Sequence, residues 1–191
     1  MIAKYKAIIL FLFLQTSVFS QDLGKVYFAG GCFWCMEESF EKKEGVIEVI
    51  SGYSGGTTEN PTYEEVTYED TGHFETIEII FDKNKTDYQD LLDHFWKNID
   101  PFDEYGQFCD KGYSYRSVAF YENDEQKKLI EISIMKLEKK FNKKIVTYVR
   151  KFDKFYQAED NHQNYYEVKF LNYLRYKKAC GREKKLNKIW N

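Results

Sequence analysis

The stretch Gly30-Gly31-Cys32-Phe33-Trp34-Cys35-Met36-Glu37 comes directly after an apolar run, Val26-Tyr27-Phe28-Ala29, and decides the fold around it. The apolar run is typical of a buried strand. After the two glycines, Cys32, Met36 and Phe40 recur at helical spacing. The stretch therefore predicts a turn from a strand into a helix, with Cys32 at or near the first turn of that helix.

The position predicted for Cys32 favours a reactive thiol. Unpaired backbone N–H groups and the helix dipole stabilise negative charge at a helix N-terminus, so a thiol ionises more easily there. Gly30 and Gly31 allow another backbone or a ligand to approach the sulfur closely. Phe33 and Trp34 place two large aromatic side chains beside it, where an ordinary turn carries polar residues.

The composition indicates one folded domain. The chain has 191 residues, and its 16 Tyr and 16 Phe supply large buried surfaces with polar tips. A formal net charge of −3 is too small to indicate a nucleic-acid partner. Basic residues concentrate between Lys177 and Lys188, and a solvated helical end explains them better than an anion site does.

The first 20 residues have the pattern of a signal peptide. Lys4 and Lys6 precede an apolar run from Ala7 to Leu14, and Ser20 is a small residue at a plausible cleavage point. The apolar run is far shorter than the roughly 20 residues that span a bilayer, which leaves a buried N-terminal helix as the alternative. We expect residues 1–20 to be removed during export and residues 21–191 to form a single domain in the periplasm or outside the cell.

The rest of the sequence alternates between strand and helix patterns. Strands are predicted at residues 46–50, 74–81, 117–121 and 145–149. Helices are predicted at residues 62–66, after a cap at Thr86 or Asp87, after a cap at Asn123 or Asp124, and at residues 159–170. Residues 51–61 are expected to form a glycine-rich loop, and residues 102–116 a long loop of the kind that is usually functional. This order predicts an α/β (α+β) fold, a two-layer sandwich of a mixed sheet with packed helices.

Glu75 lies near the start of the strand predicted at residues 74–81. Alternation places it on the same face as Ile77, Ile79 and Phe81. A carboxyl group buried among apolar side chains and a solvated strand start are both compatible with this pattern.

Three kinds of chemistry compete for the four cysteines of the mature chain. A zinc site needs four compatible ligands, and Cys109 and Cys180 are isolated from each other in the sequence, so no metal is predicted. The spacing of Cys32 and Cys35 after a strand is typical of a thioredoxin-like thiol-disulfide oxidoreductase, although two intervening aromatic residues are unusual for that class. A secreted binding domain with one structural disulfide is the third interpretation, and it leaves the glycine-aromatic loops unexplained.

Gly30-Gly31-Cys32-Phe33-Trp34 resembles the signature of the A-type methionine sulfoxide reductases, the peptide-methionine (S)-S-oxide reductases. Six further blocks resemble the family in family order: Gly52-Tyr53-Ser54-Gly55-Gly56, Asn60-Pro61-Thr62-Tyr63-Glu64-Glu65-Val66, Thr71-Gly72-His73-Phe74-Glu75, Asp100-Pro101, Tyr115-Arg116-Ser117 and Ala158-Glu159-Asp160-Asn161-His162-Gln163. Several ordered blocks are far more specific than one motif. The resemblance extends from about Val26 to Tyr166 and implies thiol-dependent reduction of methionine S-sulfoxide, in proteins or free, to methionine.

The resemblance also implies roles for individual residues. It places catalytic roles on Cys32, Glu75, Tyr63, Tyr115 and Asp110, and the substrate methyl group against Phe33 and Trp34. Cys32 would be the nucleophile, and Glu75 the acid that protonates the sulfoxide oxygen. Tyr63 and Tyr115 would donate hydrogen bonds to that oxygen, while Asp110 would organise the site. The immediate products would be methionine and a sulfenic acid on Cys32.

The sequence departs from the common family pattern where Cys32 must return to a thiol. Cys35 stands where many members have Gly, and the chain lacks the two-cysteine tail found in some members. A sulfenic acid condenses with a nearby thiol, so Cys35 is predicted to resolve it, with Cys180 as the second candidate. Cys109 is interpreted as an ordinary loop cysteine. The expected partners are oxidised proteins or peptides and thioredoxin or a similar dithiol; we expect a monomer that uses no other cofactor.

Overall fold

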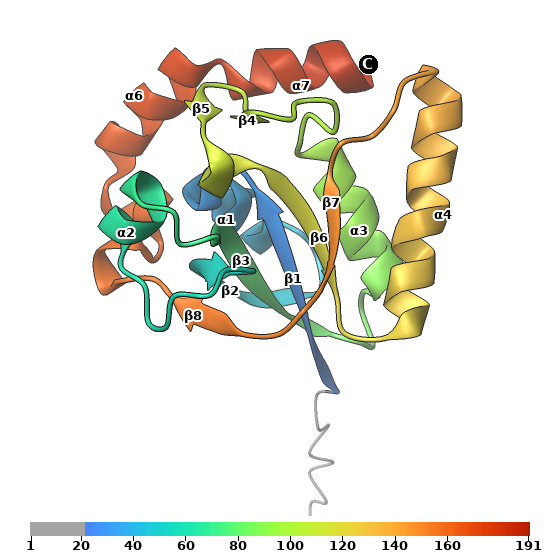
Figure 1. The fold of residues 1–191 in the computed structure, drawn as a ribbon, viewed down its shortest axis with the longest axis horizontal. Helices are drawn as coiled ribbons and strands as arrows, with labels where there is room; N and C mark the ends of the chain where they lie inside the picture. Colours follow the sequence, from blue (N-terminus) through green and yellow to red (C-terminus); the bar gives the residue numbers. More distant parts are fainter. Residues whose placement is uncertain (1–21) are drawn as a thin grey trace, which may run out of the picture.

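The computed structural model describes residues 22–191, so the predicted signal peptide, residues 1–20, lies outside the described residues. One mixed sheet is formed by β1 (Leu23–Gly30), β2 (Val46–Ser54), β3 (Phe74–Asp82), β6 (Ser117–Tyr121), β7 (Tyr148–Lys151) and β8 (Phe155–Gln157). The strand order is β7-β6-β1-β3-β2-β8 (Figure 1). Neighbouring strands are antiparallel except β6 and β7, which are parallel.

Helices pack mainly against one face and one end of this sheet. They are α1 (Phe33–Glu41), α2 (Tyr63–Tyr68), α3 (Tyr88–Lys97), α4 (Asp124–Phe141), α5 (Tyr165–Val168), α6 (Phe170–Cys180) and α7 (Arg182–Trp190). A small hairpin, β4 (Gly106–Gln107) and β5 (Asp110–Lys111), lies under α6 and α7 at the top of Figure 1. The beginning of α1 therefore lies at the end of the sheet that the C-terminal helices cover.

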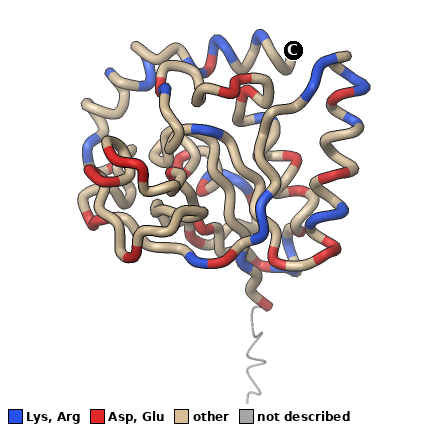
Figure 2. Tube along the Cα trace, in the orientation of Figure 1, with Lys and Arg blue, Asp and Glu red and all other residues tan. Residues whose placement is uncertain are grey.

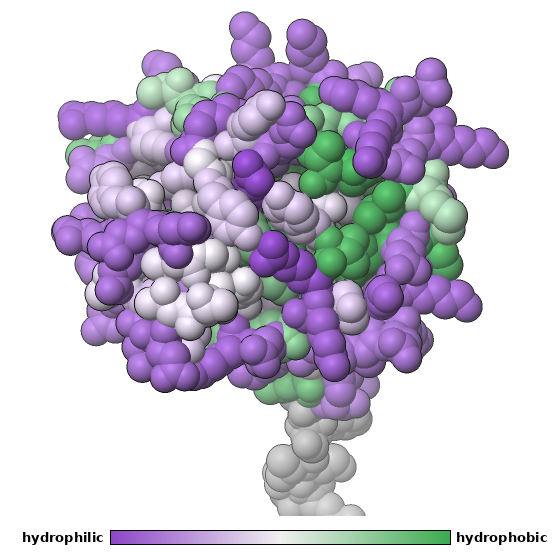
Figure 3. Space-filling model, viewed as in Figure 1, coloured by the Kyte–Doolittle hydropathy of each residue, from purple (hydrophilic) through white to green (hydrophobic). Residues whose placement is uncertain are grey.

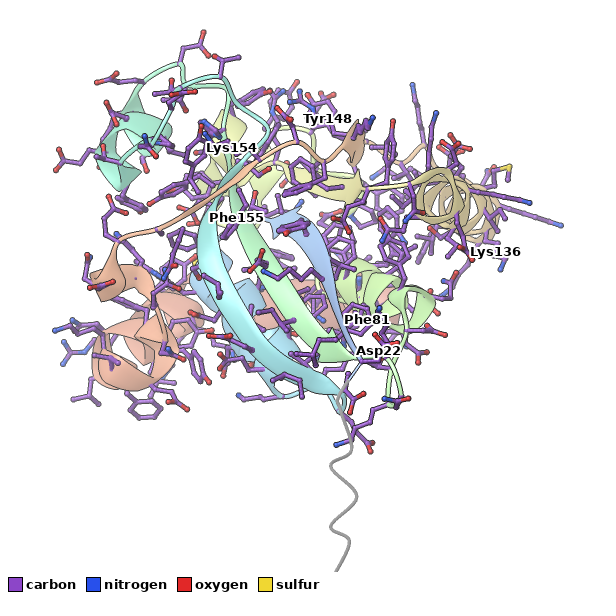
Figure 4. The ribbon with its side chains drawn as sticks, turned by 90° about the horizontal axis from the view of Figure 1, so that it is seen from below. Asp22, Phe81, Lys136, Tyr148, Lys154 and Phe155 are labelled. Atoms are coloured by element: carbon purple, nitrogen blue, oxygen red, sulfur yellow. A yellow bond between two sulfur atoms is a disulfide. The ribbon has the colours of Figure 1, made fainter. Side chains whose placement is uncertain are left out.

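The two faces of β1 separate two apolar clusters. Phe28 belongs to the main core, where its ring lies 4.6 Å from that of Phe95 in α3 and 5.9 Å from that of Phe40 in α1. Tyr27, on the opposite face, stacks on Phe152 at 3.7 Å. Phe152 belongs to the connection between β7 and β8, which crosses this second face past Tyr148 and Phe155 (Figure 4). The predicted two-layer arrangement of a mixed sheet and packed helices is confirmed.

Two predicted helix starts are found at the expected caps. The Asp87 side chain accepts a hydrogen bond from the backbone N–H of Asp90 at 2.8 Å, and Asn123 accepts one from Gln126 at 2.9 Å. Each bond satisfies one of the free N–H groups at a helix N-terminus. The local sequence therefore sets where α3 and α4 begin.

β2 is longer than the sequence predicts. The predicted loop at residues 51–61 is wrong for residues 51–54, which belong to β2 and pair with β3 on one side and β8 on the other. A Cβ atom at Gly52 would lie 2.3 Å from both the Phe155 ring and the Tyr156 carbonyl oxygen. Glycine is needed at this position because a neighbouring strand approaches closely, and it does not mark a loop.

The helix predicted at residues 159–170 is also wrong. The segment forms a 3-10 turn at Asp160–His162, then α5, and only from Phe170 the longer helix α6. Asn164 interrupts it with a left-handed backbone (φ 50°). The Gln163 side chain bonds to the backbone of Ser51 in both directions, at 3.0 and 2.9 Å, which ties this segment to β2. The strand predicted at residues 145–149 begins later, as β7.

Charged residues are spread over the surface, and Lys and Arg are frequent on α4, α6 and α7 (Figure 2). The face in Figure 3 is mostly hydrophilic, with a hydrophobic area between β7 and α4. Among residues 22–191 the helices are all too short or too polar to cross a membrane.

Candidate active site

Cys32 occupies the position that the sequence predicts, the residue that caps α1. Its carbonyl oxygen accepts hydrogen bonds from the backbone N–H of Cys35 at 3.1 Å and of Met36 at 3.3 Å. Gly31 before it has φ +78°, and a Cβ atom there would lie 2.5 Å from Cβ of Gln107 in the hairpin. The side chain of Cys32 is only 4% exposed. The predicted turn from a strand into a helix is confirmed, and the hairpin closes over it.

Cys32 and Cys35 are both free and buried, pack in one cluster, and influence each other's ionisation. The hydrogen bond from Cys32 lowers the pKa of Cys35 to about 7, against the opposing effect of burial and with help from the charge of Arg182. Burial raises the pKa of Cys32 well above its ordinary value. The two thiols titrate as a coupled pair, so the lowered pKa belongs to the pair, and the prediction that Cys32 itself ionises easily stays a prediction.

Glu75 is buried directly beside the start of α1. Its side chain is 2% exposed, and Oε2 accepts a hydrogen bond from the backbone N–H of Phe33 at 2.9 Å. Burial raises the pKa of this carboxyl well above its ordinary value, and the nearby charges of Asp110 and Cys35 raise it further. Of the two interpretations that the sequence leaves open, the buried carboxyl is confirmed and the solvated strand start is wrong.

Tyr63 and Tyr115 come from separate elements and meet at Glu75. Tyr63 is the first residue of α2, and Tyr115 is the last residue of the 3-10 turn before β6. Their hydroxyl groups influence each other's pKa, and the carboxyl group of Glu75 raises the pKa of both. Burial raises the pKa of Tyr63 to about 12 and that of Tyr115 as well. Both hydroxyls therefore keep their protons at neutral pH and are available as hydrogen-bond donors.

Aromatic rings form a wall beside the thiols. Phe33 is buried, and the half-buried Trp34 stacks on Tyr165 with ring centroids 3.9 Å apart. His162 stacks on Tyr63 at 4.4 Å and lies 5.7 Å from Trp34. Tyr165 and His162 belong to the segment whose predicted helix is broken, so periodicity gave no sign that they reach the site.

Asp110 lies in the hairpin, where the hydroxyl group of Tyr176 in α6 donates a 2.5 Å hydrogen bond to Oδ2. The neighbouring Cys109 forms a disulfide with Cys180, with their Cα atoms 5.1 Å apart. The interpretation of Cys109 as an ordinary loop cysteine is wrong, because the fold joins it to Cys180 although the two are 71 residues apart in the sequence. Phe108 has a left-handed backbone (φ 54°), and the hairpin turn at this point brings Cys109 to the end of α6.

The sulfur atoms of Cys109 and Cys180 and a carboxylate oxygen of Asp110 lie within 4.8 Å of one another. These donors could hold a thiophilic cation only if both sulfur atoms were free thiolates, with the Asp110 carboxylate as the third ligand. In this structure the two sulfur atoms are bonded to each other instead.

Acidic residues of α1 attach the C-terminal helices to the site. Glu37 Oε1 accepts a hydrogen bond from the backbone N–H of Asn164 at 2.9 Å, and burial raises the pKa of Glu37 to about 7. Glu38 Oε2 accepts hydrogen bonds from the Tyr173 hydroxyl at 2.6 Å and from Lys177 Nζ at 2.8 Å. α6 therefore lies directly over the two thiols.

Sequence reasoning missed three residues that the C-terminal helices bring to the thiols. The Tyr176 hydroxyl contacts Cys32, and the Tyr173 hydroxyl contacts Cys35. Arg182 is 4% exposed, which contradicts the prediction of a solvated basic end for this one residue. The spacing of the two tyrosines, three residues apart on one helix face, was the available signal; nothing in the run of basic residues distinguishes Arg182.

A sequence model of the family described as peptide methionine sulfoxide reductase matches residues 24–191. The chain belongs to this family. It is 48% identical over 165 residues to peptide methionine sulfoxide reductase MsrA of Bacillus velezensis, covering 85% of this chain and 93% of that protein. It is 45% identical over 172 residues to MsrA of Listeria monocytogenes, covering 89% and 97%.

Solved structures agree. Methionine sulfoxide reductase A of Corynebacterium diphtheriae superimposes with a TM-score of 0.69 at 28% identity, covering 76% of this chain and 74% of that one. Mxr1 of Saccharomyces cerevisiae in reduced form gives 0.71 at 27% identity, covering 80% and 90%. As a family member, the chain is a thiol-dependent oxidoreductase that reduces methionine sulfoxide. Neither the thioredoxin-like exchanger nor the secreted binding domain is supported.

Proposed function

We propose that the mature chain reduces the S epimer of methionine sulfoxide, in peptides and proteins and as the free amino acid, through a sulfenic acid on Cys32. The observation that supports this most directly is the convergence of Glu75, Tyr63 and Tyr115 beside the Cys32–Cys35 pair. An acid, two hydroxyl donors and a nucleophile are what removal of an oxygen from a sulfoxide requires.

In the first step Cys32 attacks the sulfoxide sulfur. The Cys35 thiolate, which accepts the hydrogen bond from Cys32, is placed to receive the Cys32 proton. Burial raises the pKa of Glu75 well above its ordinary value, which favours its acid form, and this acid gives its proton to the sulfoxide oxygen, which Tyr63 and Tyr115 hold by hydrogen bonds. The substrate S–O bond breaks, the oxygen is transferred as hydroxide to the Cys32 sulfur, and the S–S bond formed by the attack breaks with its electron pair on the methionine sulfur. Methionine leaves, reduced by two electrons, and Cys32 is a sulfenic acid. The rings of Phe33 and Trp34 form an apolar surface for the substrate methyl group.

In the second step a thiol condenses with the sulfenic acid. We favour Cys35 because it already contacts Cys32, whereas Cys180 is bonded to Cys109. Cys35 gives up the proton that it received from Cys32, and its thiolate attacks the Cys32 sulfur. An S–S bond forms, the S–O bond breaks, and the oxygen takes up that proton and leaves as water. A disulfide at a helix N-terminus is easily reduced because its dithiol form is stabilised there. An external dithiol of the thioredoxin class then regenerates both thiols, with no bound cofactor, and the chain acts as a monomer.

The decisive experiment uses residues 21–191 with pure epimers of a methionine sulfoxide peptide and a dithiol reductant. We expect turnover of the S epimer, none of the R epimer, and none of either by Cys32→Ser. Substantial sulfoxide reduction by Cys32→Ser would contradict the assignment. Rapid reduction of insulin disulfides without sulfoxide reduction would instead favour the thioredoxin-like exchanger.

We also propose that the protein is exported, on the pattern of residues 1–20. N-terminal sequencing of protein made in its native host should begin at or near Gln21. Intact Met1 on protein recovered from the cytosol would refute export.

A further inference from the structure

Arg182, the first residue of α7, is buried against the active-site turn. Its Nη2 atom donates hydrogen bonds to the carbonyl oxygens of Asn98 at 2.6 Å and Gly30 at 3.3 Å. The same atom lies 3.1 Å from Sδ of Met36, and the guanidinium lies 4.6 Å from the centre of the Phe108 ring. Gly30 comes two residues before Cys32, and Met36 follows Cys35. Arg182 therefore contacts the backbone just before the pair and a side chain just after it.

The charge of Arg182 has no carboxylate partner. Among residues 22–191, no Asp or Glu forms a salt bridge with it, and its Nη1 atom has no hydrogen-bond partner there. A buried charge without a counter-ion is strongly unfavourable. Hydrogen bonds to carbonyl oxygens offset part of this cost, and a nearby anion would offset more.

The side chains of Arg182 and Cys35 line the same cavity, of about 210 Å³. Two lysines also line it, but both are bonded to Glu38: Lys42 at 2.6 Å and Lys177 at 2.8 Å. Arg182 is therefore the cation of this cavity that no carboxylate neutralises by contact within the described chain. The other groups that interact with Cys35 are Cys32, the hydroxyls of Tyr173 and Tyr176, and the carboxyl groups of Asp110 and Glu75.

We propose that Arg182 is a positioning residue for the second step of the reaction: its buried charge keeps Cys35 in the thiolate form that attacks oxidised Cys32. The proposal rests on the proposed function, because it requires Cys35 to be the resolving thiol. In this step Cys35 is oxidised from thiolate to disulfide, Cys32 is reduced from sulfenic acid to disulfide, and the oxygen leaves as water. The direction in which Arg182 changes the pKa of Cys35, downward, agrees with this role.

The Cys109–Cys180 disulfide holds Arg182 in place. α6 ends at Cys180, Gly181 turns the chain with a left-handed backbone (φ 66°), and Arg182 follows at once. The bond from Cys180 to the hairpin therefore fixes the end of α6 two residues before the guanidinium. The same hairpin supplies Phe108, on which the guanidinium packs.

The test separates the two steps by rapid quenching after one equivalent of S sulfoxide. Methionine formed reports the first step, and the Cys32–Cys35 disulfide, mapped by mass spectrometry, reports the second. Arg182→Met removes the charge and Arg182→Lys keeps it. The matched control is Arg175→Met, which changes an exposed arginine of α6. Arg182→Gln, which retains hydrogen-bond donors, replaces Arg182→Met if the latter does not fold.

We expect the pH profiles of the rate of disulfide formation in the wild type and in Arg182→Met to cross. The hydrogen bond from Cys32 is the largest cause of the low pKa of Cys35, and the charge of Arg182 adds to it, so without the arginine the pKa of Cys35 rises. Fewer thiolates form, but each is more nucleophilic, with a Brønsted coefficient of about 0.4–0.5. For a tenfold loss of acidity of Cys35, disulfide formation in Arg182→Met should be about twofold to threefold slower than in the wild type between pH 6 and 7, and about twofold to threefold faster at pH 9. Arg182→Lys and Arg175→Met should follow the wild-type profile.

Different results would contradict the role of Arg182 and the proposed second step. A profile for Arg182→Met that runs parallel to the wild type, or that shows only a uniform loss at every pH, would overturn the role of Arg182. Absence of a Cys32–Cys35 disulfide in the wild type, with a Cys32–Cys180 bond in its place, would instead overturn the proposed second step. As an independent measurement, the thiolate absorbance of Cys35 in a Cys32→Ser background should titrate at higher pH when Arg182→Met is added. An unchanged midpoint would also contradict the proposal.

Discussion

The two cysteine pairs of this molecule lie next to each other and differ in almost every physical property. Cys32 and Cys35 are three residues apart on one helix turn, and both are free and buried. Cys109 and Cys180 are 71 residues apart, are bonded to each other, and join the hairpin to the end of α6. A local pair at a helix N-terminus favours the dithiol form, whereas a bond that closes a long loop stabilises the fold. Sequence separation and backbone context, more than the thiol itself, therefore assign one pair to chemistry and the other to structure.

The largest effect is expected from a change at Glu75, which acts with the Cys32–Cys35 pair and not with the disulfide. Glu75→Gln keeps an oxygen to accept the hydrogen bond from Phe33 but removes the proton that the sulfoxide oxygen needs. The rate of methionine formation in a single turnover should fall by about 10²–10⁴-fold, the usual range for general acid catalysis. Because burial raises the pKa of Glu75, the wild-type rate should fall as pH rises through that pKa. This descending limb should be absent in Glu75→Gln.

An unchanged single-turnover rate for Glu75→Gln would show that Glu75 has a structural role and is not the general acid. Glu78→Gln is the matched control, since Glu78 is on the same strand and its carboxylate accepts hydrogen bonds from Tyr27 and Lys25, away from the thiols. It should leave both the rate and its pH dependence within about twofold of the wild type.

The next largest effect is expected from Cys35→Ser, and a comparison with Cys180→Ser separates the roles of the two cysteine pairs. Cys35→Ser should permit one equivalent of methionine per enzyme and then cycle poorly with thioredoxin, because the sulfenic acid on Cys32 has no neighbouring thiol. Cys180→Ser should continue to cycle, with a rate reduced at most a fewfold. Steady-state turnover compared with the burst measures both. If Cys35→Ser cycles normally while Cys180→Ser stalls after the burst, the roles of the two residues are the reverse of those proposed.

The difference between the pairs also explains what the sequence could and could not predict. The turn at Cys32, the strand at Ser117–Tyr121 and the caps at Asp87 and Asn123 depend on neighbours within a few residues, and the structure has them as predicted. The residues to which the resemblance gives roles do gather at Cys32, although they come from α1, α2, β3, the hairpin and the 3-10 turn before β6.

The missed features depend on contacts between distant residues. The Cys109–Cys180 bond joins the hairpin to a helix 71 residues later, and no local pattern shows that they meet. Arg182 looks like its basic neighbours until the end of α6 is placed against Gly30 and Asn98. The sequence around Gly52 suggests a loop because β8, the strand that pairs beside this glycine, lies about a hundred residues further along the chain.

The smallest effect on activity is expected from breaking the second pair. Removing a bond that closes a loop of this length should lower the free energy of unfolding by about 4 kcal/mol on the loop-entropy model. The double variant Cys109→Ser with Cys180→Ser should show this loss in urea unfolding, while the burst of methionine stays close to the wild-type size. A dithiol reductant should destabilise the wild type by a similar amount and leave the double variant unaffected. Cys35→Ser, which breaks no bond in the reduced protein, is the control and should unfold near the wild-type midpoint. If the double variant is as stable as the wild type, the bond contributes no stability, and the assignment of this pair to structure is wrong.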